Sequence, residues 1–144
     1  MSFSNPYYVG LGNVGSYQVS GMPYATSSIA APASSGTPTV VTFPYVTQRI
    51  VVTNTTNGSA LRVGFSANGA KGTNYFIIPA APSNLTGPPP SVEMKIKVNS
   101  IYILSNTATP TSASILAELT NIDSNLLINS GPSGSNWSGS NGVG

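Results

Sequence analysis

Apolar and polar residues alternate in several short stretches of the chain. Every second residue from Val92 to Val98 is apolar, and the residues between them are charged. Residues 46–53 alternate as well, with Gln48, Ile50 and Val52 on one side and Thr47, Arg49, Val51 and Thr53 on the other. A period of two places successive side chains on opposite faces of a β-strand. The pattern therefore predicts strands with one face toward a core.

Extending this pattern along the chain predicts eight strands. They are Met22–Ile29, Pro38–Phe43, Val46–Thr53, Ala60–Ser66, Thr73–Ile78, Val92–Val98, Ser100–Leu104 and Ser112–Asn121. The connecting segments are rich in Gly, Pro, Asn and Ser, which are turn residues. The last run also contains good helix formers, but its alternating apolar residues favour a strand. No other stretch favours a helix.

Eight short strands in one domain, residues 22–123, predict an all-β fold. An eight-stranded antiparallel jelly roll fits this count, and an immunoglobulin-like sandwich fits it nearly as well. The segment Tyr75–Ile78 is apolar on both faces, so we expect something to cover its second face. Residues 1–21 are interpreted as an N-terminal arm and residues 124–144 as a Gly/Ser-rich C-terminal tail.

Charged residues are scarce, at 6% of the chain against about 25% in an ordinary soluble domain. Neutral Ser, Thr, Asn and Gly supply the polar surface, which lowers the cost of burying it against neighbouring molecules. The net charge of +2 comes from scattered Lys and Arg, so we expect no nucleic-acid partner. No stretch approaches the roughly 20 apolar residues of a membrane-spanning helix, so we expect no membrane insertion.

The chain has no His and no Cys, which removes the usual general base, thiol nucleophiles and zinc–thiolate sites. We therefore expect no enzyme, no cofactor and no metal site. Glu93 and Glu118 could form a glycosidase pair, but a surface ion-pair patch is favoured because two lysines flank Glu93. The Gly-rich segment Gly64–Thr73 lacks the GxxxxGK[ST] spacing and a following helix, so we expect an ordinary loop.

Four Asn-X-Ser/Thr sequons occur, at Asn54, Asn57, Asn84 and Asn136. Each is a glycosylation acceptor only in a compartment that contains the transferase. The N-terminus has neither the basic nor the apolar region of a signal peptide. We therefore expect synthesis in the cytoplasm and interpret the sequons as chance matches in a chain rich in Asn, Ser and Thr.

Several aromatic residues lie mostly outside the predicted core strands. Candidate assembly contacts are Tyr7, Tyr8, Tyr17 and Trp137, and Tyr24 belongs to the same set. Aromatic side chains are enriched as interface anchors. The alternative is that these segments fold back on their own domain, and the two interpretations do not exclude each other.

The apolar content of the tail is thin, and ordering each residue costs about 1–2 kcal/mol of backbone entropy. We therefore expect neighbouring subunits or an underlying shell protein to hold the tail. Under this interpretation, deleting residues 124–144 leaves the melting temperature of the β-domain nearly unchanged.

Six segments together resemble the penton protein of the nucleocytoplasmic large DNA viruses. They are YVTQRIVVTN (Tyr45–Asn54), LRVGFS (Leu61–Ser66), KGTNYF (Lys71–Phe76), EMKIK (Glu93–Lys97), IYILS (Ile101–Ser105) and SILAELT (Ser114–Thr120). The resemblance covers roughly residues 40–123 and rests on the order and spacing of these segments. It implies a single jelly roll, five copies of which form the capsomer at each fivefold vertex of an icosahedral capsid. The implied partners are the chain itself, the major capsid protein and minor capsid proteins, and the implied location is the virion capsid.

Two other interpretations remain open. One is a carbohydrate- or receptor-binding β-sandwich in which Arg62, Lys71 and nearby aromatics contact the ligand. The other is a minor cement protein of a capsid. The leading expectation is a structural virion protein that forms a homopentamer and has no catalytic residues.

Overall fold

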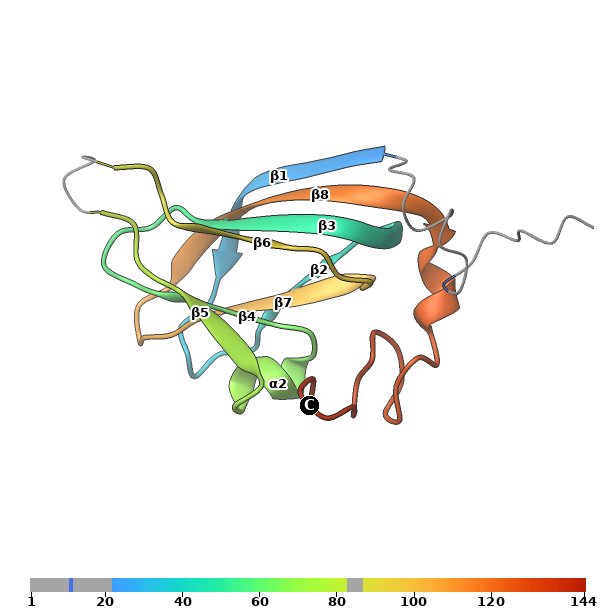
Figure 1. The fold of residues 1–144 in the computed structure, drawn as a ribbon. Coiled ribbons are helices and arrows are strands. Elements are labelled where there is room, and N and C mark those ends of the chain that lie inside the picture. The colour runs from blue at the N-terminus through green and yellow to red at the C-terminus, as the bar shows by residue number, and fades with distance from the viewer. Residues whose placement is uncertain (1–10, 12–21, 83–86) are drawn as a thin grey trace, which may run out of the picture.

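The computed structural model describes residues 11, 22–82 and 87–144. Within these residues it confirms the expected all-β fold, with eight strands in two antiparallel sheets (Figure 1). The strands are β1 (Met22–Ala31), β2 (Thr39–Thr42), β3 (Tyr45–Asn54), β4 (Leu61–Gly64), β5 (Tyr75–Ile78), β6 (Ser91–Met94), β7 (Ser100–Ser105) and β8 (Thr111–Asp123). Each of the eight predicted strands is present.

The order of the strands in the two sheets follows a simple rule. The first sheet has the order β1-β8-β3-β6 and the second has the order β2-β7-β4-β5. The first strand thus pairs with the eighth, the second with the seventh, the third with the sixth and the fourth with the fifth. The pairs β3–β8 and β4–β7 join these ribbons side by side. Strands far apart in the sequence therefore lie next to each other in both sheets.

The core lies between the two sheets. Ile50 and Val52 of β3 are fully buried and face Val63, Ile101 and Ile103 of the second sheet in one apolar cluster. The alternation predicted for residues 46–53 and 92–98 is confirmed for most positions, because their apolar sides pack on this cluster. Buried apolar area of this kind is the main stabilising contribution to a sandwich.

Thr47 departs from the predicted alternation. It was expected beside Arg49 on the outer face but is fully buried, because the register of β3 against β8 is irregular on both sides of it. Its Oγ1 donates to the carbonyl oxygen of Ile96 at 2.8 Å, and its N–H donates to that of Val98 at 3.0 Å. Thr47 thereby binds the backbone beyond Met94, where the regular β3–β6 ladder has ended. The predicted strand Val92–Val98 is consequently shorter than expected.

The Gly-rich segment 64–73 is not the plain loop that was expected, because it contains the short helix α2 (Ala67–Lys71). The Ser66 side chain caps this helix by accepting the N–H of Gly69 at 2.9 Å. Backbone atoms of Ala70 lie 3.1–3.2 Å from where a Cβ of Gly64 would stand. Gly64 therefore permits the helix to pack directly on β4. Five residues are too few to show helical periodicity in a sequence.

The outer face of β5 is covered less than was expected. Ile78 is fully buried, whereas Ile77 is 47% exposed. The guanidinium group of Arg62 lies 4.4 Å from the centre of the Tyr75 ring and covers that residue. The described residues form two sheets, so the face of β5 that points away from the first sheet borders the surface rather than a further layer.

Candidate assembly surfaces

The outer face of the first sheet carries an apolar row on a mostly neutral surface. Ala25 of β1 pairs with Leu116 of β8, which in turn pairs with Val51 of β3. The Leu116 side chain is 44% exposed. These residues, with Thr53 and Ser114, line a shallow hollow of about 400 Å³. The row offers an apolar contact surface. The neutral Thr and Ser side chains around it lose little free energy when they are removed from water.

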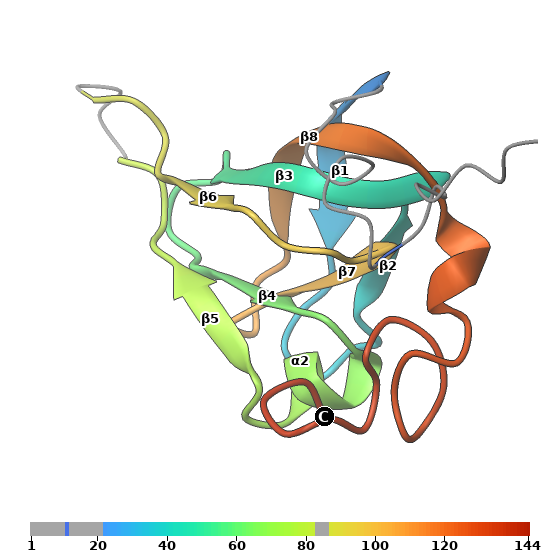
Figure 2. The same cartoon turned by 45° about the vertical axis from the view of Figure 1, so that its right-hand side comes forward.

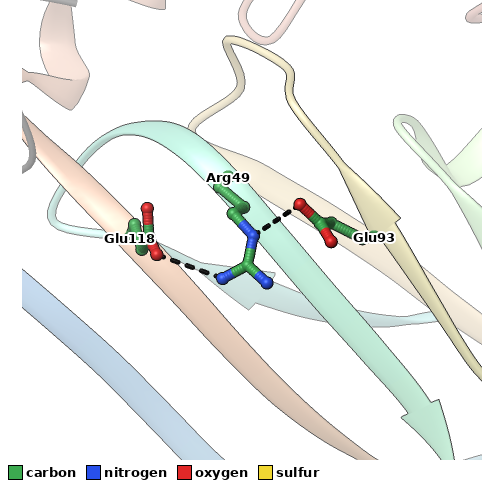
Figure 3. Close-up of polar contacts among 3 residues, drawn as sticks. All are labelled: Arg49, Glu93 and Glu118. Carbon is green, nitrogen blue, oxygen red and sulfur yellow. Dashed lines mark hydrogen bonds and ion pairs between the residues drawn. The ribbon is translucent and has the colours of Figure 1, made fainter. Parts of the chain in front are cut away.

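An ion-pair network lies beside this row. Figure 3 shows Arg49 on β3 between Glu93 on β6 and Glu118 on β8. Its Nε is 2.7 Å from Glu93 Oε1, and its Nη1 is 3.0 Å from Glu118 Oε1. The hydrogen bond from Arg49 lowers the pKa of Glu93, and the same bond raises the pKa of Arg49. Both carboxylates thus bind one guanidinium group.

This geometry matches the surface ion-pair patch that was favoured over a glycosidase pair, although the central cation was not anticipated. The sequence placed Arg49 on a strand face, and the cations named beside Glu93 were its two flanking lysines. The strand order alone brings Arg49 between the two glutamates, and that order is not visible in the sequence. The side chains of all three residues are between 29% and 48% exposed, so solvent screens the pairs.

On the outer face of the second sheet, Arg62 is bound within its own chain. Besides stacking on Tyr75, its Nε donates to Asn106 Oδ1 at 2.8 Å and its Nη1 to the Ala70 carbonyl oxygen at 3.3 Å. Lys71, the other residue expected to contact a ligand, lies at the end of α2. A ligand would have to compete with several existing contacts of Arg62. The same face exposes Val40 and Ile77 by nearly half.

The C-terminal tail packs against its own domain. It begins with the 3₁₀ helix η1 (Ser124–Leu127), and its last residues lie beside α2 (Figure 2). Asn136 is only 2% exposed, and its Oδ1 accepts the N–H groups of Asn99 and Ser100 at 2.8 and 3.4 Å. Its Nδ2 donates to the carbonyl oxygens of Phe65 and Ser100 at 2.8 and 2.9 Å. The Asn136 side chain thus binds the backbone directly after β4 and the backbone at the start of β7.

Trp137, one of the candidate assembly contacts, also lies against its own domain. Its Nε1–H donates to the carbonyl oxygen of Lys97, and its ring packs against both apolar clusters of the core. The smaller cluster is built on Val46, Ile122 and Leu127. The tail therefore folds back on its own domain, which was the alternative left open, and the expected contacts with neighbouring molecules stay a prediction. Composition did not reveal this, because four hydrogen bonds from a single Asn do not depend on apolar content.

The other candidate contacts, Tyr7, Tyr8 and Tyr17, lie outside the described residues. Leu11 packs on the smaller cluster, and its carbonyl oxygen accepts from Lys97 Nζ at 2.7 Å. Leu11 and Trp137 therefore both pack on the smaller cluster. Tyr24 belongs to the core, because its ring packs edge-on against Phe43 with the ring centres 5.0 Å apart.

A groove of about 440 Å³ remains between the tail and the segment before β7. Its walls are Phe65, Ile96, Val98, Trp137 and Val143, with Lys95 and Lys97 at its side. The apolar side chains come from three separate parts of the chain. The docked tail therefore forms one wall of the groove, through Trp137 and Val143.

Two of the four sequons are incompatible with a glycan in this fold. Asn54 is fully buried, and its amide nitrogen donates to the carbonyl oxygens of Ser59 and Pro79 at 2.8 and 3.0 Å. Asn136 uses its whole amide in the contacts given above. Asn57 is exposed, and Asn84 lies outside the described residues.

Comparisons with protein-family models, with curated proteins and with solved structures found no match. Within the described residues, no three His, Asp or Glu side chains gather as potential metal ligands. The helices in that part of the chain are too short and too polar to cross a membrane. The functional argument therefore rests on the strand order, the two outer faces and the tail.

Proposed function

We propose that the chain is a capsid subunit with a jelly-roll fold. The observation that carries this proposal is the strand order, in which the first strand pairs with the eighth and each inner pair follows in turn. A ribbon of paired strands wound in this way into two four-stranded sheets is the arrangement of a jelly roll, a fold common among viral capsid proteins. In an immunoglobulin sandwich the first strand pairs with the second instead. Here β1 and β2 belong to different sheets.

Within this class, the role we favour is the penton subunit at the fivefold vertex. The segments that resemble the penton family fall on β3, β4, β5, β7 and β8 and on the segment that includes the end of β6. They therefore belong to both sheets rather than to one exposed loop. A homopentamer that contacts the major and minor capsid proteins follows from the resemblance, and its location is the virion capsid.

The two outer faces support assembly into a closed ring. A ring of identical subunits uses a heterologous interface, in which each subunit presents different surfaces to its two neighbours. Leu116 is exposed on the first sheet, and Val40 and Ile77 are exposed on the second. Charged groups on the first sheet are largely paired with one another, which limits repulsion between copies. The outer faces of the two sheets thus supply the two different contact surfaces that each subunit of a ring needs.

Light scattering coupled to size-exclusion chromatography tests the proposal on the full chain. We expect a closed pentamer whose fraction rises with protein concentration. Leu116→Lys and Ile77→Lys should each shift the population toward monomer, because each places a charge on one of the two proposed faces. Ser35→Lys, at an exposed position in the connection between β1 and β2 and outside both sheets, is the control. A highly soluble monomer at every concentration would contradict the capsid role.

A further inference from the structure

The sequence contains three identical Asn-Gly pairs, at residues 57–58, 68–69 and 141–142. In such a pair the backbone nitrogen of Gly attacks the side-chain carbonyl carbon of Asn and expels ammonia, which forms a five-membered succinimide. Water then opens the ring to Asp or to isoaspartate. Gly favours the reaction because it has no side chain to hinder the approach and can adopt many backbone conformations. The sequence alone predicts the same rate of succinimide formation for the three pairs, but their structural surroundings differ.

The pair at residues 68–69 is held in the least reactive geometry. It lies inside α2, where the Gly69 N–H donates to the capping Ser66 Oγ at 2.9 Å. Gly69 is buried, and the carbonyl oxygen of Val143 lies against it. The helix has to open before this nitrogen can reach the Asn68 side chain.

The pair at residues 57–58 is intermediate. Both residues are exposed, and Gly58 has a positive φ of 83°. Asn57, however, forms a parallel β-bridge with Ala81, whose N–H donates to the Thr56 carbonyl oxygen at 3.0 Å. This bridge restrains the backbone on both sides of the reacting bond.

The pair at residues 141–142 lies in neither a helix nor a β-bridge, although the Val143 and Gly144 N–H groups close a turn around it by donating to the Ser140 carbonyl oxygen. Asn141 and Gly142 are both exposed, and Gly142 has a φ of 88°. No atom lies within 4 Å of where a Cβ of Gly142 would stand, and the same holds for Gly58, so the absence of a β-bridge is what separates the two exposed pairs. Within the described part of the chain, the Gly142 N–H makes no backbone hydrogen bond. We propose that Asn141 is a spontaneous deamidation site and that it converts faster than Asn57 and Asn68.

Conversion at Asn141 changes the docking of the tail. The turn that contains it is closed by the Val143 N–H, which donates to the Ser140 carbonyl oxygen at 3.0 Å. The next contact is the Ser66 hydroxyl, which donates to the Val143 carbonyl oxygen at 2.8 Å. Isoaspartate inserts one methylene group into the main chain between Ser140 and Val143, so this turn cannot close with the same geometry. The reaction therefore acts as a slow, irreversible release of the last residues from α2, and it does not depend on the proposed capsid role.

Peptide mapping by mass spectrometry tests the order of the three sites. The full chain is incubated at mildly alkaline pH, and each Asn-Gly peptide is scored for deamidation and, by enzymatic methylation, for isoaspartate. We expect Asn141 to convert at least roughly tenfold faster than Asn68, because α2 must first open. In urea the three rates should converge. A rate for Asn141 in the folded chain no higher than that of Asn57 or that of Asn68 would overturn the proposal.

Two variants separate the effect of the extra methylene group from that of the new charge. Asn141→Gln removes the five-membered ring pathway, and Asn141→Asp supplies the charge with a normal backbone. Hydrogen exchange of the Val143 amide reports on the docked turn. We expect faster exchange after incubation of the wild-type chain, but not in incubated Asn141→Gln or in freshly prepared Asn141→Asp. Equal loss of protection in incubated Asn141→Gln would exclude Asn141 as the cause.

Discussion

The sandwich and the C-terminal tail are held in place in different ways. In the sandwich, apolar side chains such as Ile50 and Ile103 are fully buried, and many neighbours share the stabilisation. In the tail, a segment rich in Gly and Ser is fixed by the buried amide of Asn136, the ring of Trp137 and the fully buried side chain of Leu127. The difference shows that a low-complexity composition is compatible with order when a few side chains bind unpaired backbone groups.

The tail also carries backbone strain that the sandwich largely avoids. Asn136 and Trp137 both have positive φ values, of 58° and 65°. Asn tolerates this region better than other residues with side chains, whereas Trp does not. Such conformations cost about 1–3 kcal/mol each and persist only where the surroundings compensate. We therefore expect the tail to open locally before the sandwich unfolds.

The largest expected effect comes from removing a core side chain. Ile103→Ala should lower the free energy of unfolding by about 2–5 kcal/mol, because it leaves a cavity between the sheets. The matched control is Ile77→Ala, the same change at an exposed position, which should stay within about 0.5 kcal/mol. Urea unfolding followed by circular dichroism measures both. Similar losses for the two variants would contradict the assignment of inner and outer faces.

The next largest effect tests the anchoring of the tail. Asn136→Ala should lower the free energy of unfolding by about 1–3 kcal/mol, because buried N–H and carbonyl groups lose their partner. Asn141→Ala removes an exposed amide of the same size and serves as the control. Trp137 is the only tryptophan, so its fluorescence reports undocking of the tail separately from the sheets. An unchanged stability and spectrum would restore the interpretation that neighbouring molecules hold the tail.

A smaller effect is expected from the indole hydrogen bond. Trp137→Phe keeps an aromatic ring in the apolar cluster but removes the donor to the Lys97 carbonyl oxygen. The free energy of unfolding should fall by about 0.5–1.5 kcal/mol, the net value of one hydrogen bond. Trp137→Ala, which also loses the ring, should cost more. Equal losses for the two variants would assign the whole contribution to the hydrogen bond.

The smallest effect concerns the exposed ion pairs of the first sheet. Because the folded state lowers the pKa of Glu93, the pair stabilises the protein above the ordinary pKa of the carboxyl group, 4.5, and this contribution is lost as the pH falls through the folded value. Glu93→Gln should therefore reduce the drop in urea midpoint between neutral and acidic pH. High salt should shrink the difference between the variant and the wild-type chain. If high salt left the difference between Glu93→Gln and the wild-type chain unchanged, dissolved ions would not be screening the Arg49–Glu93 pair.

The strands were predictable because their signal is local. The alternation in β3 and the apolar residues of β8 define an inner face whatever the neighbouring strands are. Short elements were not predictable, because α2 and η1 are too brief to show a period. The burial of Thr47 also escaped prediction, since it follows from an irregular register that involves two other strands.

The sequence by itself determined the all-β class, the number of strands, the scarcity of charge and the absence of His and Cys. Only the tertiary structure decided which strands are neighbours, and with them the placement of Arg49 between Glu93 and Glu118. It also decided that Asn136 meets the backbone of Phe65 and Ser100. These contacts join residues many positions apart, so they depend on how the ribbons pack rather than on any local pattern. Hydrogen bonds made over such distances leave no period in the sequence, whereas burial of one strand face does.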